Sequence, residues 1–371
     1  MRYLNCLAII VLISCIGKPN ETELGYFSNF QFSLDTVIID SNPEIIFLKY
    51  QLFGSDKSND DRYLLNFNMN DHTVEKINLD ELRQEEKLPF EKEGPNGTGP
   101  FIGRINAINE NQIMLNGMNQ SALFSLDGKR LRKFNFENFS LGGHPMEGGE
   151  ELKSSGVFDP ESNRIYGLIF RHMDKSYVLG ILHLDAYEIS KVELKTFVRM
   201  ADFTFNYNVS GSILIKSPEG EIEKHGSKVI LSNQVTSSLM WYDTELDSLF
   251  IKSYKNKLTA NEKVKDYKLD HNAKESFEAE YMRFHSEINF LPPFWDQKNQ
   301  IFYRFSFEEN EDKTKVYLTA YDMELNQIGE SRVPQLIKKP AKHFAKDGNI
   351  WIYENTNDEM GFVRLKMENI N

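Results

Sequence analysis

Apolar and polar residues alternate in short runs along most of the chain, and polar turns separate these runs. The alternation is typical of half-buried β-strands, because successive side chains of a strand point to opposite faces of a sheet. A recurring unit consists of a run that ends in Asp or another polar residue, a short turn and a second alternating run. The first runs of its copies cover residues 63–71, 122–127, 177–185, 239–243, 316–322 and, in truncated form, 362–367. The first four runs end 56, 58 and 58 residues apart, which predicts a repeat of about 58 residues.

Most copies are preceded by another strand, in which a polar turn leads into an apolar run, as in residues 158–170, 294–307 and 346–353. Each unit therefore supplies about four antiparallel strands. One four-stranded sheet cannot bury both of its faces, whereas similar sheets packed around an axis can. The pattern predicts an all-β fold, a six-bladed β-propeller, with seven blades possible. The alternative is a β-sandwich with a second domain.

The two ends of the chain are predicted to share one sheet. Residues 30–39 alternate strongly, and the last unit, residues 335–367, ends without its final strand. Pairing the two would remove exposed sheet edges. We therefore expect a single propeller domain over residues 30–371, closed by its N- and C-terminal strands.

One insertion, at about residues 255–288, interrupts the repeat. Phe277, Tyr281, Phe284 and Ile288 recur there at helical spacing beside charged residues. This pattern predicts a short amphipathic helix that packs on the blades. A helix that binds a partner is the alternative.

The N-terminus has the features of an export signal. Arg2 is followed by an apolar run, residues 4–13, which is too short to span a bilayer. Residues 12–15, Leu-Ile-Ser-Cys, resemble the bacterial lipobox, in which the cysteine becomes lipid-modified. We expect a signal peptide over 1–14, and a lipidated Cys15 with a tether over 15–29; an ordinary secretory signal is the alternative. The other cysteine, Cys6, would be removed with the signal.

Composition narrows the range of partners. The 371 residues include 43 Lys and Arg against 55 Asp and Glu, giving a formal net charge of −12. Without a cluster of basic residues the chain is not expected to bind nucleic acid, since phosphate binding depends on such clusters. We expect a monomer.

Three further segments carry a resemblance to a known family: residues 32–40, residues 90–99 with their Glu-Gly-Pro-Asn-Gly sequence, and residues 229–234. Together with the lipobox they resemble a family of bacterial lipoproteins known only as a domain of unknown function, with a TolB-like six-bladed β-propeller. The resemblance implies the fold and a place in the bacterial cell envelope, on the outer membrane. It implies no activity, so no catalytic residues can be transferred.

Candidate ligand-binding residues lie in loops that should share one face of a propeller. Connections between blades, and those between the second and third strands of a blade, emerge there, and we also place residues 56–61 on this face. Many of these loops are acidic, which suits a cation, a basic partner or a glycan; they could equally be solvated tips. The candidates are Glu93, Asn96, His144, Glu147, Arg171, His172 and Arg304. For Arg304, which lies among alternating aromatic residues, a structural ion pair is the alternative.

Motifs for metals and catalysis are weak. Pro145 disfavours a helix at His144 and Glu147, so the spacing of a helical zinc motif is lost. Residues 56–61 have alternating oxygen ligands, as calcium loops do, but lack the glycine and the distal glutamate, so no cofactor is expected and calcium has only slight support. No nucleophile elbow, P-loop or dinucleotide fingerprint is present.

The sequence thus predicts a lipid-anchored envelope protein that binds a glycan or protein ligand without catalysis. The alternative is a hydrolase or lyase that acts on an envelope or extracellular polysaccharide through carboxylates of the channel, or through His144 and His172.

Overall fold

The computed structural model describes residues 24–41, 44–117, 120–135, 142–143, 146–153, 156–264, 266–309 and 313–369. Within them the fold is all-β, with one α-helix, α1 (Lys274–Ser286). The predicted signal peptide and Cys15 lie outside the described residues. No helix in the described part of the chain is long and apolar enough to cross a membrane.

Six sheets of four or more strands follow one another along the chain, and we number them sheets 1 to 6. Sheet 1 contains β3 (Ser55–Lys57), β4 (Tyr63–Asn68), β5 (Thr73–Asn78) and β6 (Arg83–Pro89). Sheet 2 contains β7 (Arg104–Asn109), β8 (Gln112–Asn116), β9 (Gln120–Ser125) and β10 (Arg130–Asn135). Sheet 3 contains β12 (Glu150–Leu152), β13 (Val157–Asp159), β14 (Arg164–Arg171), β15 (Ser176–His183), β16 (Glu188–Glu193) and the short β11 (Gly142–Gly143).

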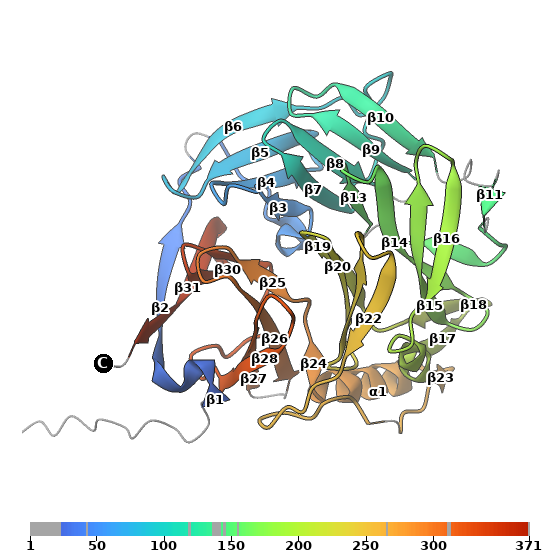
Figure 1. Ribbon diagram of the computed structural model, residues 1–371, viewed down its shortest axis with the longest axis vertical. Helices are drawn as coiled ribbons and strands as arrows, with labels where there is room; N and C mark the ends of the chain where they lie inside the picture. The colour runs from blue at the N-terminus through green and yellow to red at the C-terminus, as the bar shows by residue number, and fades with distance from the viewer. Residues whose placement is uncertain are drawn as a thin grey trace, which may run out of the picture.

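The second half of the chain repeats this order. Sheet 4 contains β19 (Gly220–His225), β20 (Lys228–Asn233), β21 (Leu239–Asp243) and β22 (Ser248–Lys252). Sheet 5 contains β24 (Asn289–Phe290), β25 (Phe294–Asp296), β26 (Ile301–Glu309), β27 (Thr314–Tyr321), β28 (Gln327–Arg332) and β1 (Leu24–Gly25). Sheet 6 contains β29 (His343–Lys346), β30 (Asn349–Thr356), β31 (Glu359–Asn369) and β2 (Phe30–Ile38). This succession of antiparallel sheets is propeller-like, and in Figure 1 the sheets follow one another around a central region.

The Asp or other polar residue that ends each repeated run lies, in most sheets, in the turn after the third strand. Asp243 accepts hydrogen bonds from the backbone N–H groups of Glu245 and Leu246 (3.0 and 3.1 Å), which fixes the turn into the next strand. In sheet 1 the corresponding residue is Asn78, which accepts from two backbone N–H groups in the same way. The prediction that Asp71 is the equivalent residue of sheet 1 is wrong. Asp71 lies in the turn between the second and third strands, β4 and β5, and not after the third strand.

Apolar clusters join the sheets in pairs. Six clusters among the described residues each take side chains from two successive sheets, and one of these clusters joins sheet 6 to sheet 1. Pairs that share a cluster are Leu65 and Ile113, Met114 and Ile165, Tyr166 and Tyr242, Leu239 and Phe302, Phe305 and Ile352, and Phe362 and Leu64. Each sheet therefore buries both faces against neighbours.

The two ends of the described chain meet in sheet 6, as the alternation in residues 30–39 predicts. β2 pairs antiparallel with β31 from Phe30 opposite Asn369 to Ile38 opposite Gly361. Arg364 binds both carboxylate oxygens of Asp35 across this pair (2.9 and 2.6 Å). Just before β2, Phe27 is fully buried between sheets 5 and 6, so the N-terminal segment fastens both sheets.

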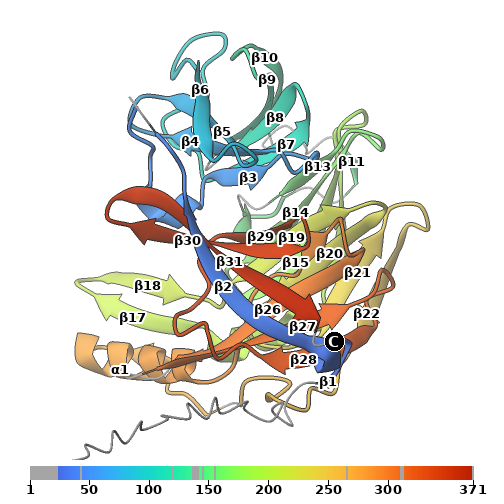
Figure 2. The same ribbon diagram turned by 90° about the vertical axis from the view of Figure 1, so that its left-hand side faces the viewer.

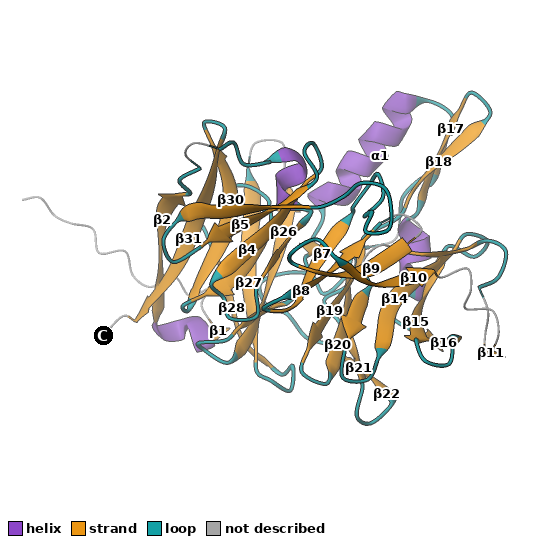
Figure 3. Cartoon of the chain, turned by 90° about the horizontal axis from the view of Figure 1, so that it is seen from above, coloured by secondary structure: helices purple, strands orange, loops and turns teal. Residues whose placement is uncertain are grey.

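The predicted insertion forms a lobe together with the segment between sheets 3 and 4, and this lobe consists of α1 and a small three-stranded sheet. The small sheet contains β17 (Phe205–Val209), β18 (Ser212–Lys216) and β23 (Asp270–His271), and the ring of Phe277 on α1 stacks on Tyr207 at 5.4 Å. Phe277 and Phe284 are buried, as the helical spacing predicts. Figures 2 and 3 show α1, β17 and β18 projecting from the six sheets.

We predict that Phe27→Ala lowers the free energy of unfolding by about 3–5 kcal/mol, because it leaves a cavity between sheets 5 and 6. Leu34→Ala, on β2 but 38% exposed, is the control and should cost under about 1 kcal/mol. Urea unfolding measures both. Equal losses would show that the N-terminal segment does not fasten the two sheets.

Candidate functional site

Loops of the six sheets emerge on two faces. Strands alternate in direction, so connections between sheets and those between second and third strands share one face, which we call the linker face. The remaining turns share the opposite face, which we call the turn face. Residues 58–62 join β3 to β4, the first two strands of sheet 1, so they lie on the turn face. The prediction that residues 56–61 face the same way as the connections between sheets is therefore wrong.

A pocket opens on the linker face between sheets 4 and 5. The space inside it that the centre of a water molecule can occupy is only about 10 Å³, so it is a small hollow in the surface and not a deep cavity. One side is polar and comes from sheet 4, namely Glu219, Glu221, Ser232, Asn233 and Gln234. The other side is largely apolar and comes from sheet 5 and the following linker, namely Phe290, Leu291, Pro292, Phe307 and Lys339.

Asn233 is placed by the turn that follows β20. Its Oδ1 accepts hydrogen bonds from the backbone N–H groups of Val235 and Thr236 (2.9 and 3.0 Å). Its Nδ2 is shielded from solvent and has no hydrogen-bond partner among the described residues, and Asn233 is one of the residues that line the pocket. A buried donor without a partner costs free energy, and a ligand acceptor that reached this amide would recover that cost.

The buried guanidinium of Arg304 fixes this turn through hydrogen bonds to its backbone carbonyls. It is 1% exposed and donates to the carbonyls of Leu291 (2.7 Å), Ser237 (2.6 Å) and Asn233 (3.1 Å), with Thr236 at 3.4 Å. Because β26 supplies the arginine and sheet 4 supplies three of these carbonyls, the guanidinium joins both walls of the pocket. Arg304 itself does not line the pocket.

A charged group lies beside the pocket. Arg104 at the start of β7 reaches Glu223 (2.8 Å) and Glu221 (3.6 Å) on β19, although sheet 3 separates sheets 2 and 4 along the chain. Burial raises the pKa of the Glu221 carboxyl to about 7, and Glu223 and Glu219 add to this, while Arg104 opposes it. Glu221 therefore changes charge near neutral pH.

The arrangement suits a ligand with both polar and apolar surfaces. Asn233 offers a donor, the carboxyls of Glu219 and Glu221 offer acceptors, and Glu221 also offers a donor when protonated. Phe290 and Pro292 provide an apolar wall, and the ammonium group of Lys339 lies 5.4 Å from the centre of the Phe307 ring. Sugar units combine hydroxyl groups with apolar C–H faces in this way.

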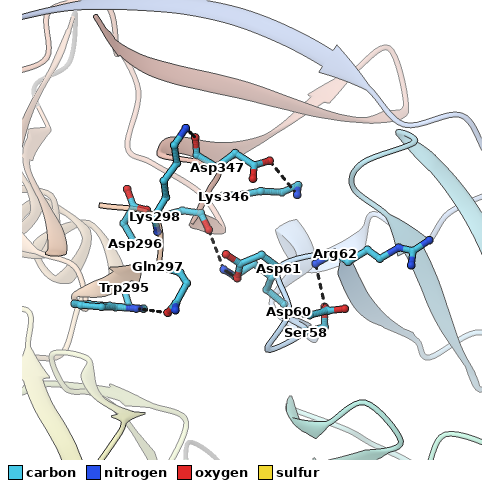
Figure 4. Close-up of polar contacts among 12 residues, drawn as sticks. Ser58, Asp60, Asp61, Arg62, Trp295, Asp296, Gln297, Lys298, Lys346 and Asp347 are labelled. Carbon is cyan, nitrogen blue, oxygen red and sulfur yellow. Dashed lines mark hydrogen bonds and ion pairs between the residues drawn. The ribbon is translucent and has the colours of Figure 1, made fainter. Parts of the chain in front are cut away.

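On the turn face, Figure 4 shows a second polar group whose charges satisfy one another. Lys346 binds Asp80 (2.5 Å) and Asp347 (3.1 Å), and Lys298 donates to the Asp347 carbonyl (3.0 Å). Lys57 binds Asp61 and the carbonyl of Ala345. These contacts tie sheets 5, 6 and 1 together, so their role is structural.

The predicted residues Glu93 and Asn96 lie in the linker between sheets 1 and 2. Glu93 is exposed, and Asn96 accepts a hydrogen bond from the backbone N–H of Arg130 (3.2 Å). Neither lines the pocket between sheets 4 and 5.

The other predicted residues gather at sheet 3. Arg171 binds Glu150 (3.2 Å) and Glu193 (2.8 Å), His172 contacts Glu151 (3.1 Å), and Glu147 is exposed. His144 lies outside the described residues. The structure thus brings Glu147, Arg171 and His172 to sheet 3, whereas Glu93 lies in the linker between sheets 1 and 2, and none of the four lines the pocket.

Metal ligands do not cluster in the described residues, since no group of three or more His, Cys, Asp or Glu side chains is placed to hold an ion. In the segment considered for calcium, Asp56 accepts from the backbone N–H groups of Lys57 and Ala107, and Asp60 accepts from Ser58 (2.5 Å) and the N–H of Arg62. Local donors thus already occupy these carboxylates.

The residues that sequence reasoning missed are Arg104, Glu219, Glu221, Asn233 and Lys339. One signal was available: in β19 the acidic Glu221 and Glu223 alternate with the buried Ile222, which places both carboxylates on one side of a strand. Asn233 lies in the segment 229–234 that carries the family resemblance, but nothing in that segment marks it as a site residue, because its place in the pocket wall depends on sheet 5.

We predict that the free energy of unfolding falls as pH rises from about 4.5 to 7, because folded Glu221 keeps its proton longer than the unfolded chain does. Glu221→Gln should remove about 1–3 kcal/mol of this fall. Glu245→Gln, in the exposed turn between β21 and β22, is the control and should keep it. Urea unfolding across this pH range decides; an unchanged slope in Glu221→Gln would contradict the assignment.

Comparisons with known proteins agree with the architecture. A crystal structure of a DUF4221 member from Bacteroides vulgatus ATCC 8482 has a TM-score of 0.66 at 13% identity, covering 92% of this chain and 99% of that one. A Bacteroides fragilis NCTC 9343 protein described as exported has a TM-score of 0.53 at 10% identity, covering 93% and 97%. At these identities the likeness concerns the fold alone.

No curated protein sequence matches the chain. The family model described as "Domain of unknown function (DUF4221)" matches residues 28–332, which is most of the chain. The chain therefore belongs to the DUF4221 family.

Proposed function

We propose that this protein is a lipid-anchored component of the bacterial cell envelope that binds a glycan in the pocket between sheets 4 and 5. The observation that carries the proposal is the buried Asn233 Nδ2, a donor without a partner among the described residues, which belongs to a residue of the pocket wall. A hydroxyl-rich ligand supplies the missing acceptor, and the apolar wall at Phe290 and Pro292 suits the face of a sugar ring.

For the fold, the proposal is a six-bladed β-propeller in which sheets 1 to 6 are the blades and β2 closes the last one. Six apolar clusters that each join two successive sheets, sheet 6 to sheet 1 included, support this arrangement. The small sheet differs from a blade, because β23 pairs parallel with β17 and β18 is exposed along its length. This favours six blades over seven.

For the location, the proposal is the outer membrane, with Cys15 as the lipidated residue. The lipobox-like residues 12–15 follow a short apolar run, as lipoprotein signals require. Between Cys15 and Leu24 the chain can span about 30 Å when extended. This length lets the domain stand clear of the bilayer.

A second candidate function is hydrolysis or elimination on a polysaccharide. One observation favours it: Glu221, whose pKa is raised to about 7, holds a proton near neutral pH as a general acid must. Glu219 or Glu223 would then be the second carboxylate. Release of shorter products from a bound polysaccharide, lost in Glu221→Gln, distinguishes catalysis from binding.

We predict that Asn233→Asp weakens glycan binding at least about tenfold, because it keeps both turn hydrogen bonds but replaces the unpaired donor with an acceptor. Affinity electrophoresis with dextran, xylan, polygalacturonate and chondroitin sulfate gives the wild-type affinities. Asn326→Asp, on the turn face, is the matched control.

Wild-type retardation by one of these polymers, lost in Asn233→Asp and kept in Asn326→Asp, supports the proposal. Equal retardation of both variants would place the binding site elsewhere. Lack of retardation of the wild-type protein by every polymer would reject glycan binding of these classes.

A further inference from the structure

β18 is an exposed apolar strand at the edge of the small sheet. The strand order is β18-β17-β23, so β18 has no strand partner on its outer side among the described residues. Ile213, Leu214 and Ile215 are 62%, 44% and 38% exposed. Figures 2 and 3 show this hairpin projecting from the body, where another molecule can reach it.

The hairpin turn determines which backbone groups point outward. Ser210 and Gly211 both have positive φ (46° and 85°), as in a type I′ turn. In such a turn the flanking Val209 and Ser212 form a hydrogen-bonded pair, so Ser212 faces β17. Because the direction alternates along a strand, Ile213 and Ile215 present their N–H and C=O groups outward.

This edge has few of the features that usually prevent strand pairing. β18 contains no proline, its register with β17 has no bulge, and its one charged residue is Lys216 at the end of the strand. Natural edge strands are commonly protected by one of these devices or by a covering segment. A regular, apolar and open edge is therefore a surface for adding a strand.

We propose that the occupant of this edge is β18 of a second copy of the chain, paired antiparallel about a two-fold axis through Leu214. Ile213 of each copy then lies opposite Ile215 of the other, and every outward N–H and C=O of these isoleucines is paired. Ser212 lies opposite Lys216, so no like charges meet. The two small sheets become one continuous sheet.

In this register, like side chains of the two copies of β18 meet on each face of the joined sheet. Ile213 and Ile215 of both copies meet on one face, and the two Leu214 side chains meet on the other. The contact is small compared with a stable dimer interface, so self-association should depend on concentration, and anchoring in one membrane would favour it. This differs from the monomer expected from the sequence, and it does not depend on the glycan site.

Disulfide trapping in the full chain tests the register. Cys6→Ser and Cys15→Ser make an introduced cysteine the sole thiol. Leu214→Cys places two thiols at a non-hydrogen-bonded antiparallel pair, with Cα atoms about 4.5 Å apart, within the range of disulfides. Ser212→Cys is the matched control on the same strand, since its two copies would lie about 13 Å apart.

Because Cys15→Ser removes the proposed lipid anchor, we expect mild oxidation of the unlipidated purified protein to give at least about fivefold more covalent dimer with Leu214→Cys than with Ser212→Cys. Adding Ile213→Pro, which removes only an outward N–H, should abolish the excess. Proline is tolerated at such an edge position, so the hairpin should remain folded. Equal dimer yields from the two cysteines, or no dimer from Leu214→Cys, would overturn the proposal.

Discussion

The pocket between sheets 4 and 5 depends on how the buried charge of Arg304 is satisfied inside the protein. A buried guanidinium is costly unless its N–H groups find acceptors, and Arg304 finds them in backbone carbonyls on both sides of the boundary between sheets 4 and 5. Three of these carbonyls belong to the turn from Asn233 to Ser237. The turn cannot move without leaving the cation unsatisfied, so the position of the Asn233 side chain is fixed before a ligand arrives.

The charged and the apolar side chains of the pocket lie on separate walls. The sheet 4 wall carries Glu219 and Glu221 near Arg104, and the sheet 5 wall carries Phe290 and Pro292. Because burial raises the pKa of Glu221 to about 7, this wall gains a proton donor as the pH falls through neutrality. A ligand that accepts a hydrogen bond from protonated Glu221 would bind more tightly below pH 7. The polar group on the turn face differs in kind, because lysine–aspartate contacts there already use its charges.

Much of the architecture could be predicted from the sequence, because strand alternation and Asx turns are local properties. The pairing of residues 30–39 with the chain end, and the buried Phe277 and Phe284 of α1, follow from period alone. The unit at 63–71 was misplaced because Asp71 ends an alternating strand too, in a different hairpin. A polar residue after a strand does not say which strand of the sheet it follows.

The candidate site was harder to predict, because its parts come from different sheets. Arg304 was identified as a candidate, but only the structure shows that it lies beneath the pocket. Asn233, Glu221 and Lys339 converge through the packing of sheet 4 on sheet 5, which no local pattern encodes. Loop composition instead directed attention to Glu93 and Arg171, which lie near other sheets.

The central claim is that Asn233 donates its free amide hydrogen bond to a sugar. A crystal structure of the protein soaked with an oligosaccharide, cut from whichever polymer it binds, tests this most directly. The account predicts a sugar oxygen about 2.7–3.2 Å from Asn233 Nδ2, with the ring against Phe290 and Pro292. An oligosaccharide bound at another sheet, with Asn233 Nδ2 facing only solvent, would contradict it.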